Sequence, residues 1–121
     1  MSVSARIAPP NSLLLVSDER GGEIPQSQAG ALLTFTSSCI AIGSLCEIDG
    51  ETEITLGQAD EVDPGGEPHF EGSLETPTRR LAVRTVLGDT VLEVWVPDLR
   101  TSLRIWVNDS AEPDKIVVGF H

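Results

Sequence analysis

The sequence predicts an all-β fold: a single-domain antiparallel β-sandwich or jelly roll of about nine strands, spanning residues 1–121. Three observations predict it. Apolar residues recur with a period of two or in short runs rich in β-branched side chains. Glycine or proline interrupts every window long enough for a good helix. The chain has 121 residues, of which 40% are hydrophobic, and this is enough for one buried core.

Nine segments have the composition of strands, and short turns join most of them. Two connections are longer: residues 18–30, and the acidic stretch 57–68 that contains Pro64-Gly65-Gly66. Residues 1–10 have little to anchor them beyond Ile7, so we expect the N-terminus to fray. In chain order the predicted strands are 12–17, 31–36, 39–48, 52–56, 69–74, 80–87, 90–96, 101–107 and 115–120.

The C-terminal half predicts a three-stranded register. A two-residue turn at Gly88-Asp89 predicts a hairpin in which Leu81 lies opposite Val96 on the core face. A four-residue turn at 97–100 then brings the next strand alongside. The outer face of these strands would carry a ladder of charges with a tryptophan on either side: Arg84, Glu93 and Arg104, flanked by Trp95 and Trp106.

A second hairpin is predicted by the Asp49-Gly50 turn, with Ile48 opposite Glu51. Its apolar residues share one face only if one extra residue is inserted near Gly43-Ser44. We therefore expect a β-bulge there, because glycine is the residue that such a kink prefers.

The two cysteines, Cys39 and Cys46, are seven residues apart in a run that has an extended pattern. In one continuous strand they would lie about 23 Å apart, which is too far for a disulfide. Neither has the neighbours that are typical of a catalytic cysteine. We expect both to be reduced thiols with a structural role.

Charge is unevenly distributed along the chain. No Lys or Arg lies between Gly21 and Thr78, where eleven of the 19 acidic residues lie, so this segment carries all of the net charge of −11. An acidic surface disfavours nucleic acid and anionic membranes and attracts basic partners. The alternative is that acidity only keeps a small domain soluble.

No apolar run resembles a membrane helix or a signal-peptide core, so we expect a cytoplasmic protein.

Two groups of residues are candidate sites. Tryptophan and arginine are enriched in binding hot spots, which makes the predicted outer face a candidate partner-binding surface, comprising Trp95, Trp106, Arg84, Glu93 and Arg104. The alternative is that the arginines stack on the rings and Glu93 neutralises them. The second group, Asp60, Asp63 and His69, is a candidate metal site, although its spacing does not match a calcium loop and a solvated loop is the alternative.

Catalytic motifs are missing from the sequence. It contains no glycine-rich phosphate loop, no serine elbow, no zinc-ligand spacing and no tyrosine. We therefore expect neither enzyme activity nor a cofactor.

The stretch from Phe70 to Trp95 has alternating apolar residues in a strand pattern that is punctuated by Gly72, Pro77 and Leu81. It resembles the second half of the competence-protein-J-like small β-sandwich proteins. Members of that family are known as nuclease inhibitors. The resemblance implies a β-sandwich and an inhibitory role, and it assigns that role to no particular residue of this chain.

Together these observations predict a non-enzymatic, bacterial-type domain that binds another protein, as an inhibitor or immunity-type factor for a basic partner such as a nuclease. Two alternatives stay open. One is a module that binds a small ligand or a divalent metal ion, and the other is a homodimer formed through the tryptophan face. Binding to nucleic acid or membranes is not expected.

Overall fold

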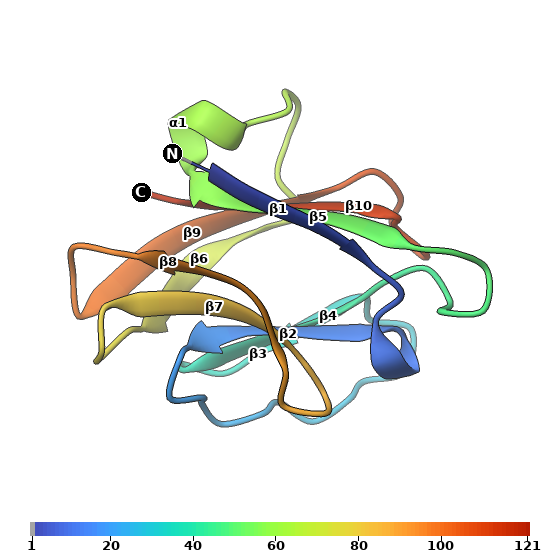
Figure 1. Ribbon diagram of the computed structural model, residues 1–121, viewed down its shortest axis with the longest axis horizontal. Coiled ribbons are helices and arrows are strands. Elements are labelled where there is room, and N and C mark those ends of the chain that lie inside the picture. The colour runs from blue at the N-terminus through green and yellow to red at the C-terminus, as the bar shows by residue number, and fades with distance from the viewer. Residues whose placement is uncertain (1) are drawn as a thin grey trace.

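Two β-sheets stack face to face in the computed structural model, which describes residues 2–121 (Figure 1). Each sheet has five strands in this part of the chain. We call them sheet I and sheet II. In spatial order, sheet I contains β1 (Ser2–Ile7), β5 (Thr52–Gln58), β10 (Lys115–Phe120), β9 (Arg100–Val107) and β6 (Phe70–Glu75). Sheet II contains β3 (Leu33–Phe35), β4 (Cys39–Gly43), β2 (Leu13–Asp18), β7 (Arg80–Thr85) and β8 (Thr90–Trp95).

The predicted all-β sandwich is confirmed. Strands β5 and β10 run parallel, and the other neighbouring strands run antiparallel. Two short helical turns accompany the strands, a 3-10 turn at Pro10–Ser12 and the single-turn helix α1 at Ala59–Val62. Within residues 2–121 no helix has both the length and the apolar character that crossing a membrane requires.

The core lies between the inner faces of the two sheets. Inward residues alternate with outward ones, as in β5, where Ile54 and Leu56 are fully buried while Glu53 and Thr55 are only partly buried. Burying each large aliphatic side chain contributes about 1.5–3 kcal/mol of transfer free energy. The buried core residues are Leu14, Val16, Ile40, Ile42, Ile54, Leu56, Leu74, Leu81, Val83, Leu92, Val96, Leu103, Ile105, Ile116, Val118 and Phe120.

Strand β1 was not predicted from the sequence. It pairs with β5 along its whole length, from Ser2 opposite Gly57 to Ile7 opposite Thr52. Its alternate residues Val3, Ala5 and Ile7 pack against the core. Serine, alanine and arginine give this segment little intrinsic strand propensity, so its structure comes from pairing and from burial of one face.

The predicted β7–β8 hairpin is present, but its register was wrong by two residues. Leu81 lies opposite Val94 and not opposite Val96. The turn is longer than two residues, because the Thr85 carbonyl accepts a hydrogen bond from the Gly88 N–H at 3.1 Å. Val83 lies opposite Leu92 but Arg84 lies opposite Thr90, which leaves Val91 as the extra residue of a bulge.

The predicted pairing of β8 with β9 was also wrong, because these strands belong to different sheets. The chain crosses between the sheets after Trp95. Thr76 holds the crossing in place: its N–H donates to the Leu99 carbonyl at 2.8 Å and its hydroxyl donates to the Asp98 carbonyl at 2.8 Å. Leu103 and Ile105 are buried in the core in either arrangement, so apolar alternation does not distinguish a hairpin from a crossing.

The second predicted hairpin was wrong for the same reason. β4 ends at Gly43 in sheet II and β5 begins in sheet I, so Ile48 is 87% exposed and does not lie in a strand. The predicted bulge near Gly43-Ser44 is the point where the chain leaves the sheet. There the Ser44 N–H donates to the Ser12 carbonyl, and the Leu45 N–H donates to the Pro113 carbonyl.

Candidate protein-binding site

The two tryptophans of the predicted binding face lie in different environments. Trp95, at the end of β8, is 70% exposed, whereas Trp106, on β9, is 4% exposed. The loop after α1 reaches over Trp106, whose indole N–H donates to the Gly66 carbonyl at 3.3 Å. A long loop thus covers one tryptophan and leaves the other in solvent.

The predicted charge ladder does not form. Arg104 lies opposite Glu71 in sheet I, and its Nε donates to the Glu71 carboxylate at 3.0 Å. Arg84 lies on sheet II, where its guanidinium donates to the Gly88 carbonyl at 3.2 Å. Of the five residues predicted to form the surface, Trp95 and Glu93 remain together because they belong to one strand.

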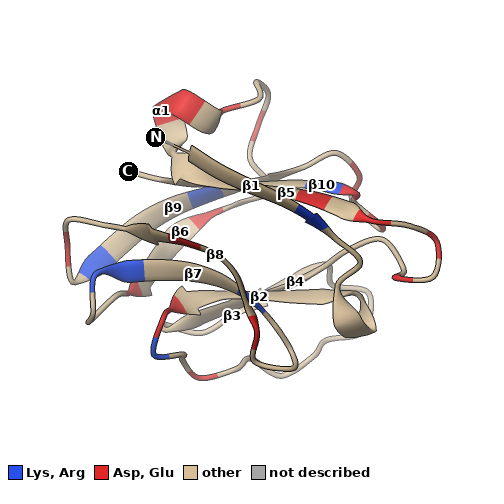
Figure 2. Cartoon of the chain, in the orientation of Figure 1, with Lys and Arg blue, Asp and Glu red and all other residues tan. Residues whose placement is uncertain are grey.

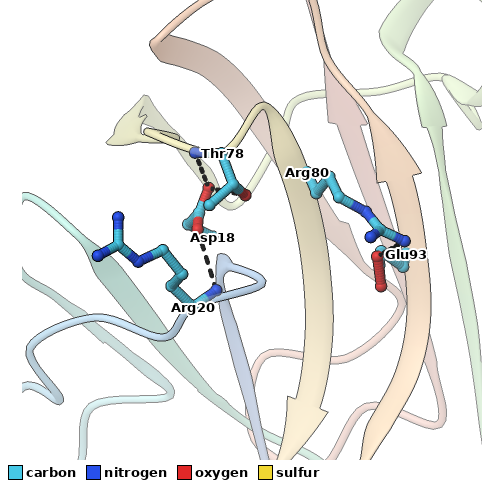
Figure 3. A network of polar contacts seen from close by, with 5 residues as sticks. All are labelled: Asp18, Arg20, Thr78, Arg80 and Glu93. Atoms are coloured by element: carbon cyan, nitrogen blue, oxygen red, sulfur yellow. Dashed lines mark hydrogen bonds and ion pairs between the residues drawn. The ribbon is translucent and has the colours of Figure 1, made fainter.

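Arg80 takes the place that the prediction gave to Arg84. It lies opposite Trp95, its guanidinium carbon is 4.9 Å from the centroid of the Trp95 ring, and it forms an ion pair with Glu93. Figure 3 shows Arg80 and Glu93 side by side on the neighbouring strands. Sequence reasoning missed Arg80 because a slip of two residues preserves which face each side chain is on while it changes every cross-strand partner.

A buried carboxylate ties the turn before Arg80 to the end of β2. Asp18 is 1% exposed, and its Oδ1 accepts hydrogen bonds from the Thr78 N–H at 3.0 Å and the Thr78 hydroxyl at 2.8 Å. Its Oδ2 accepts from the Arg20 N–H at 3.0 Å (Figure 3). Buried carboxylates require such partners. Asp18 therefore holds the β6–β7 turn next to β2 and supports the start of β7, where Arg80 lies.

A groove lies beside Trp95, and Val3 of β1 and Val94 of the neighbouring edge strand β8 are among its lining residues. We call it the Trp95 groove. It has a volume of about 360 Å³, and most of its lining is apolar: Val3, Val94, Trp95 and Phe120, with Gln58 and Glu93.

A second depression adjoins the groove at Gln58 and Phe120 and extends along α1. We call it the α1 hollow. Its volume is about 570 Å³, and Asp60, Asp63, Pro97, Arg104 and His121 are among its lining residues. The two depressions form one surface at the end of the sandwich, where both chain termini also lie (Figure 1).

The rim of this surface is acidic. The charges of Glu93 and Arg104 are balanced by their ion pairs with Arg80 and Glu71. In residues 2–121 neither Asp60 nor Asp63 forms an ion pair with a basic side chain, and Asp63 accepts only the Gly65 N–H, at 2.7 Å. The charge that Asp60 and Asp63 add in the α1 hollow, at the end of the Trp95 groove, is therefore negative.

The candidate metal ligands do not converge. Asp60 and Asp63 line the α1 hollow, but His69 is not among its lining residues and lies just before β6, where its N–H donates to the Ile105 carbonyl. Across residues 2–121 there is no group of three or more His, Cys, Asp or Glu side chains placed to hold a metal ion.

Acidic residues also gather at the opposite end of the sandwich. The connections 44–51 and 108–114 meet there through the Leu45–Pro113 hydrogen bond, and we call this region the acidic end. Figure 2 shows acidic residues there and on α1, and arginines at the starts of β7 and β9. Backbone hydrogen bonds from Glu112 and then Ala111 hold the pKa of Asp109 below its ordinary value. Of the eleven acidic residues between Gly21 and Thr78, ten are exposed, so the charge faces solvent.

Comparison with known proteins relates this architecture to one solved structure. No protein-family model matches the chain, and no curated protein matches its sequence. The fold is similar to that of ComJ from Bacillus subtilis, which is described as an inhibitor of the DNA degrading activity of NucA, with a TM-score of 0.71. The similarity covers 99% of this chain and 96% of ComJ at 8% sequence identity. The fold that the resemblance of residues 70–95 implied is therefore confirmed, and the chain shares the β-sandwich architecture of ComJ along nearly its whole length.

Proposed function

We propose that this chain is a non-enzymatic protein-binding domain that inhibits a basic partner such as a nuclease. The observation that carries the proposal is the similarity of its fold, over 99% of the chain, to that of a nuclease inhibitor. A fold by itself hosts many functions, so the surface must support the same conclusion.

The charge of the surface supports it. A protein that binds DNA neutralises phosphates with lysine and arginine, so the substrate groove of a nuclease is basic. The chain has a net charge of −11, and its carboxylates are exposed. Such a domain is attracted to the same basic surface that DNA would occupy, and its approach is accelerated by long-range attraction.

The Trp95 groove supplies an anchor for such a complex. An exposed tryptophan beside an apolar groove is typical of a binding hot spot. Of the residues predicted from sequence, Trp95 and Glu93 belong to our proposed contact surface, and Arg104 lines the adjoining hollow. Trp106 supports this surface from beneath the loop after α1.

The test is affinity capture from a lysate of the source organism at low and high salt. The bait is the wild-type domain, the Trp95→Ala variant or the Leu87→Ala variant. Leu87 is 72% exposed, does not line the Trp95 groove and provides a matched control. The captured nuclease is then purified, and its DNA degradation is measured with increasing amounts of each domain.

We expect the wild-type and Leu87→Ala domains to inhibit the nuclease equally, and Trp95→Ala to inhibit it at least about tenfold less tightly. The proposal is wrong if no nuclease is captured at low salt, or if the captured nuclease stays fully active under saturating wild-type domain.

A further inference from the structure

The edge strands of the two sheets differ in how well they are protected against pairing with another chain. The outermost strands are β1 and β6 of sheet I, and β3 and β8 of sheet II. β3 has three residues, β1 carries the exposed Arg6, and β6 carries Glu75, which forms no ion pair within residues 2–121. Shortness and charge are common protections of an exposed edge. β8 has six residues, Thr-Val-Leu-Glu-Val-Trp, and its one charged side chain, Glu93, is neutralised by Arg80.

Within residues 2–121, no strand pairs with the open side of β8, so its backbone offers hydrogen-bonding groups there. The Val96 N–H donates to the Arg79 carbonyl at 2.9 Å. This bond shows which residues of β8 direct their backbone N–H and C=O groups toward β7 in the antiparallel ladder. Because the direction of the backbone groups alternates from residue to residue, the N–H and C=O groups of Leu92 and Val94 also point toward β7. The N–H and C=O groups of Glu93 and Trp95 therefore point away from β7, toward the open edge.

The Trp95 groove runs along this open edge. Val94 and Trp95 line it from β8, Val3 lines it from β1, and Phe120 lines it from β10. A side chain that projects from an added strand toward the sandwich would therefore meet an apolar surface. The α1 hollow, with Asp60 and Asp63, begins at the end of the groove, where Gln58 and Phe120 line both depressions.

We propose that the open edge of β8 accepts an extended segment of the partner protein as an additional strand. The segment places apolar side chains in the Trp95 groove and a lysine or arginine next to Asp60 and Asp63. Backbone hydrogen bonds supply affinity that is independent of sequence, and the groove and the two aspartates select the side chains. This inference rests on the proposed function, because it states how the partner is held.

Charge favours a basic partner over a second copy of this chain as the occupant. Two copies of a domain with a net charge of −11 repel each other. A basic segment instead gains attraction from the uncompensated carboxylates at the end of the groove.

The test uses two variants that differ by one outward N–H group. Glu93→Pro removes that N–H and leaves the ladder to β7 intact, since proline is tolerated on the solvent side of an edge strand. Glu93→Ala keeps the N–H and removes the same carboxylate, so both variants lose the ion pair with Arg80 equally. The probe is a capped octapeptide of alternating lysine and valine, and the matched control peptide has glutamate in place of lysine.

Binding is followed through the backbone amide resonances of residues 91–95 in the isotope-labelled domain. We expect the lysine peptide to shift these resonances in the wild type and in Glu93→Ala. In Glu93→Pro we expect affinity to fall by about three- to tenfold, the value of one hydrogen bond. The glutamate peptide should leave these resonances unchanged, and Asp60→Asn with Asp63→Asn should weaken the lysine peptide.

The inference is overturned if the lysine peptide leaves residues 91–95 unshifted, or if it binds Glu93→Pro and Glu93→Ala equally. It is also overturned if the domain sediments as a dimer that Glu93→Pro dissociates, because a second copy would then occupy the edge.

The same two variants are assayed for inhibition of the captured nuclease. Equal inhibition by both would reject strand addition and keep the inhibitor function. Peptide binding at β8 with no nuclease captured would reject the inhibitor function and keep the docking edge.

Discussion

Trp95 and Trp106 have opposite roles although both were predicted to belong to one surface. Trp106 is packed beneath the loop after α1, and its indole N–H donates to the Gly66 carbonyl. Trp95 is exposed and contacts Arg80. We expect Trp106→Ala to lower the free energy of unfolding by about 3–5 kcal/mol because it opens a cavity. Trp95→Ala should cost about 1 kcal/mol or less, mainly the lost cation–π contact. Urea unfolding of the two variants distinguishes these costs, and equal losses would contradict the assigned roles.

The ionisation of Cys39 makes the free energy of unfolding depend on pH in the alkaline range. Burial raises the pKa of its thiol from the ordinary 9.0 to about 11, although the nearby Arg84 lowers it in part. The folded state then holds this proton more tightly than the unfolded state does. The stabilisation is complete below pH 9 and is lost as the pH rises to 11.

We expect about 2 kcal/mol of unfolding free energy to be lost over this interval because of Cys39. Denaturant unfolding at several pH values from 9 to 11 measures the loss. The Cys39→Ala variant carries every other titratable group unchanged and should lack this component. Identical pH profiles for the variant and the wild type would show that the buried thiol has no such role.

At the scale of elements, the apolar pattern of the sequence identified β5 by its alternation and β2 and β4 as short apolar runs, because β5 buries one face and β2 and β4 are buried on both. It could not assign neighbours, because a hairpin and a crossing between sheets bury the same residues. This is why β9 was placed beside β8. Of the candidate site, Trp95 and Glu93 were found from one strand, but Val3 and Phe120 reach the groove only through pairing of distant strands.

Helix α1 depends on a glycine in the strand beneath it. A Cβ at Gly119 of β10 would lie 2.8 Å from the Ala59 backbone and 3.0 Å from the Trp106 ring. We expect Gly119→Ala to cost about 1–3 kcal/mol, because α1 and Trp106 must both move. The exposed Lys115→Ala on the same strand is the control and should change stability by less than about 0.5 kcal/mol.

Fluorescence offers a direct readout of this rearrangement. In a Trp95→Phe background, Trp106 is the remaining tryptophan of the sequence. We expect Gly119→Ala to shift its emission to longer wavelength and to increase quenching by acrylamide, because the loop after α1 no longer covers the ring. An unchanged spectrum together with unchanged stability would mean that α1 does not need the close approach.

At the scale of the whole molecule, the acidic end lies opposite the end that carries the Trp95 groove and the termini (Figure 2). Arg79 lies directly before β7, and Arg80 and Arg100 are the first residues of β7 and β9, whose preceding turns are connected by the Thr76–Leu99 hydrogen bond. The field of such a molecule attracts a basic partner at a distance, while short-range contacts at the groove determine how long the complex lasts.

Salt should therefore affect the free domain and its complex in opposite directions. Screening relieves self-repulsion among carboxylates that carry a net charge of −11, so the Tm of the free domain should rise with sodium chloride. The same screening should lower the association rate with the captured nuclease about tenfold or more between low and physiological salt, with little change in the dissociation rate.

A triple variant of the acidic end, Glu47→Gln, Asp49→Asn and Glu51→Gln, should weaken both salt effects and keep the dissociation rate. If its dissociation rate rises while its association rate is unchanged, the acidic end contacts the partner directly, and the division between long-range attraction and anchoring at Trp95 is wrong.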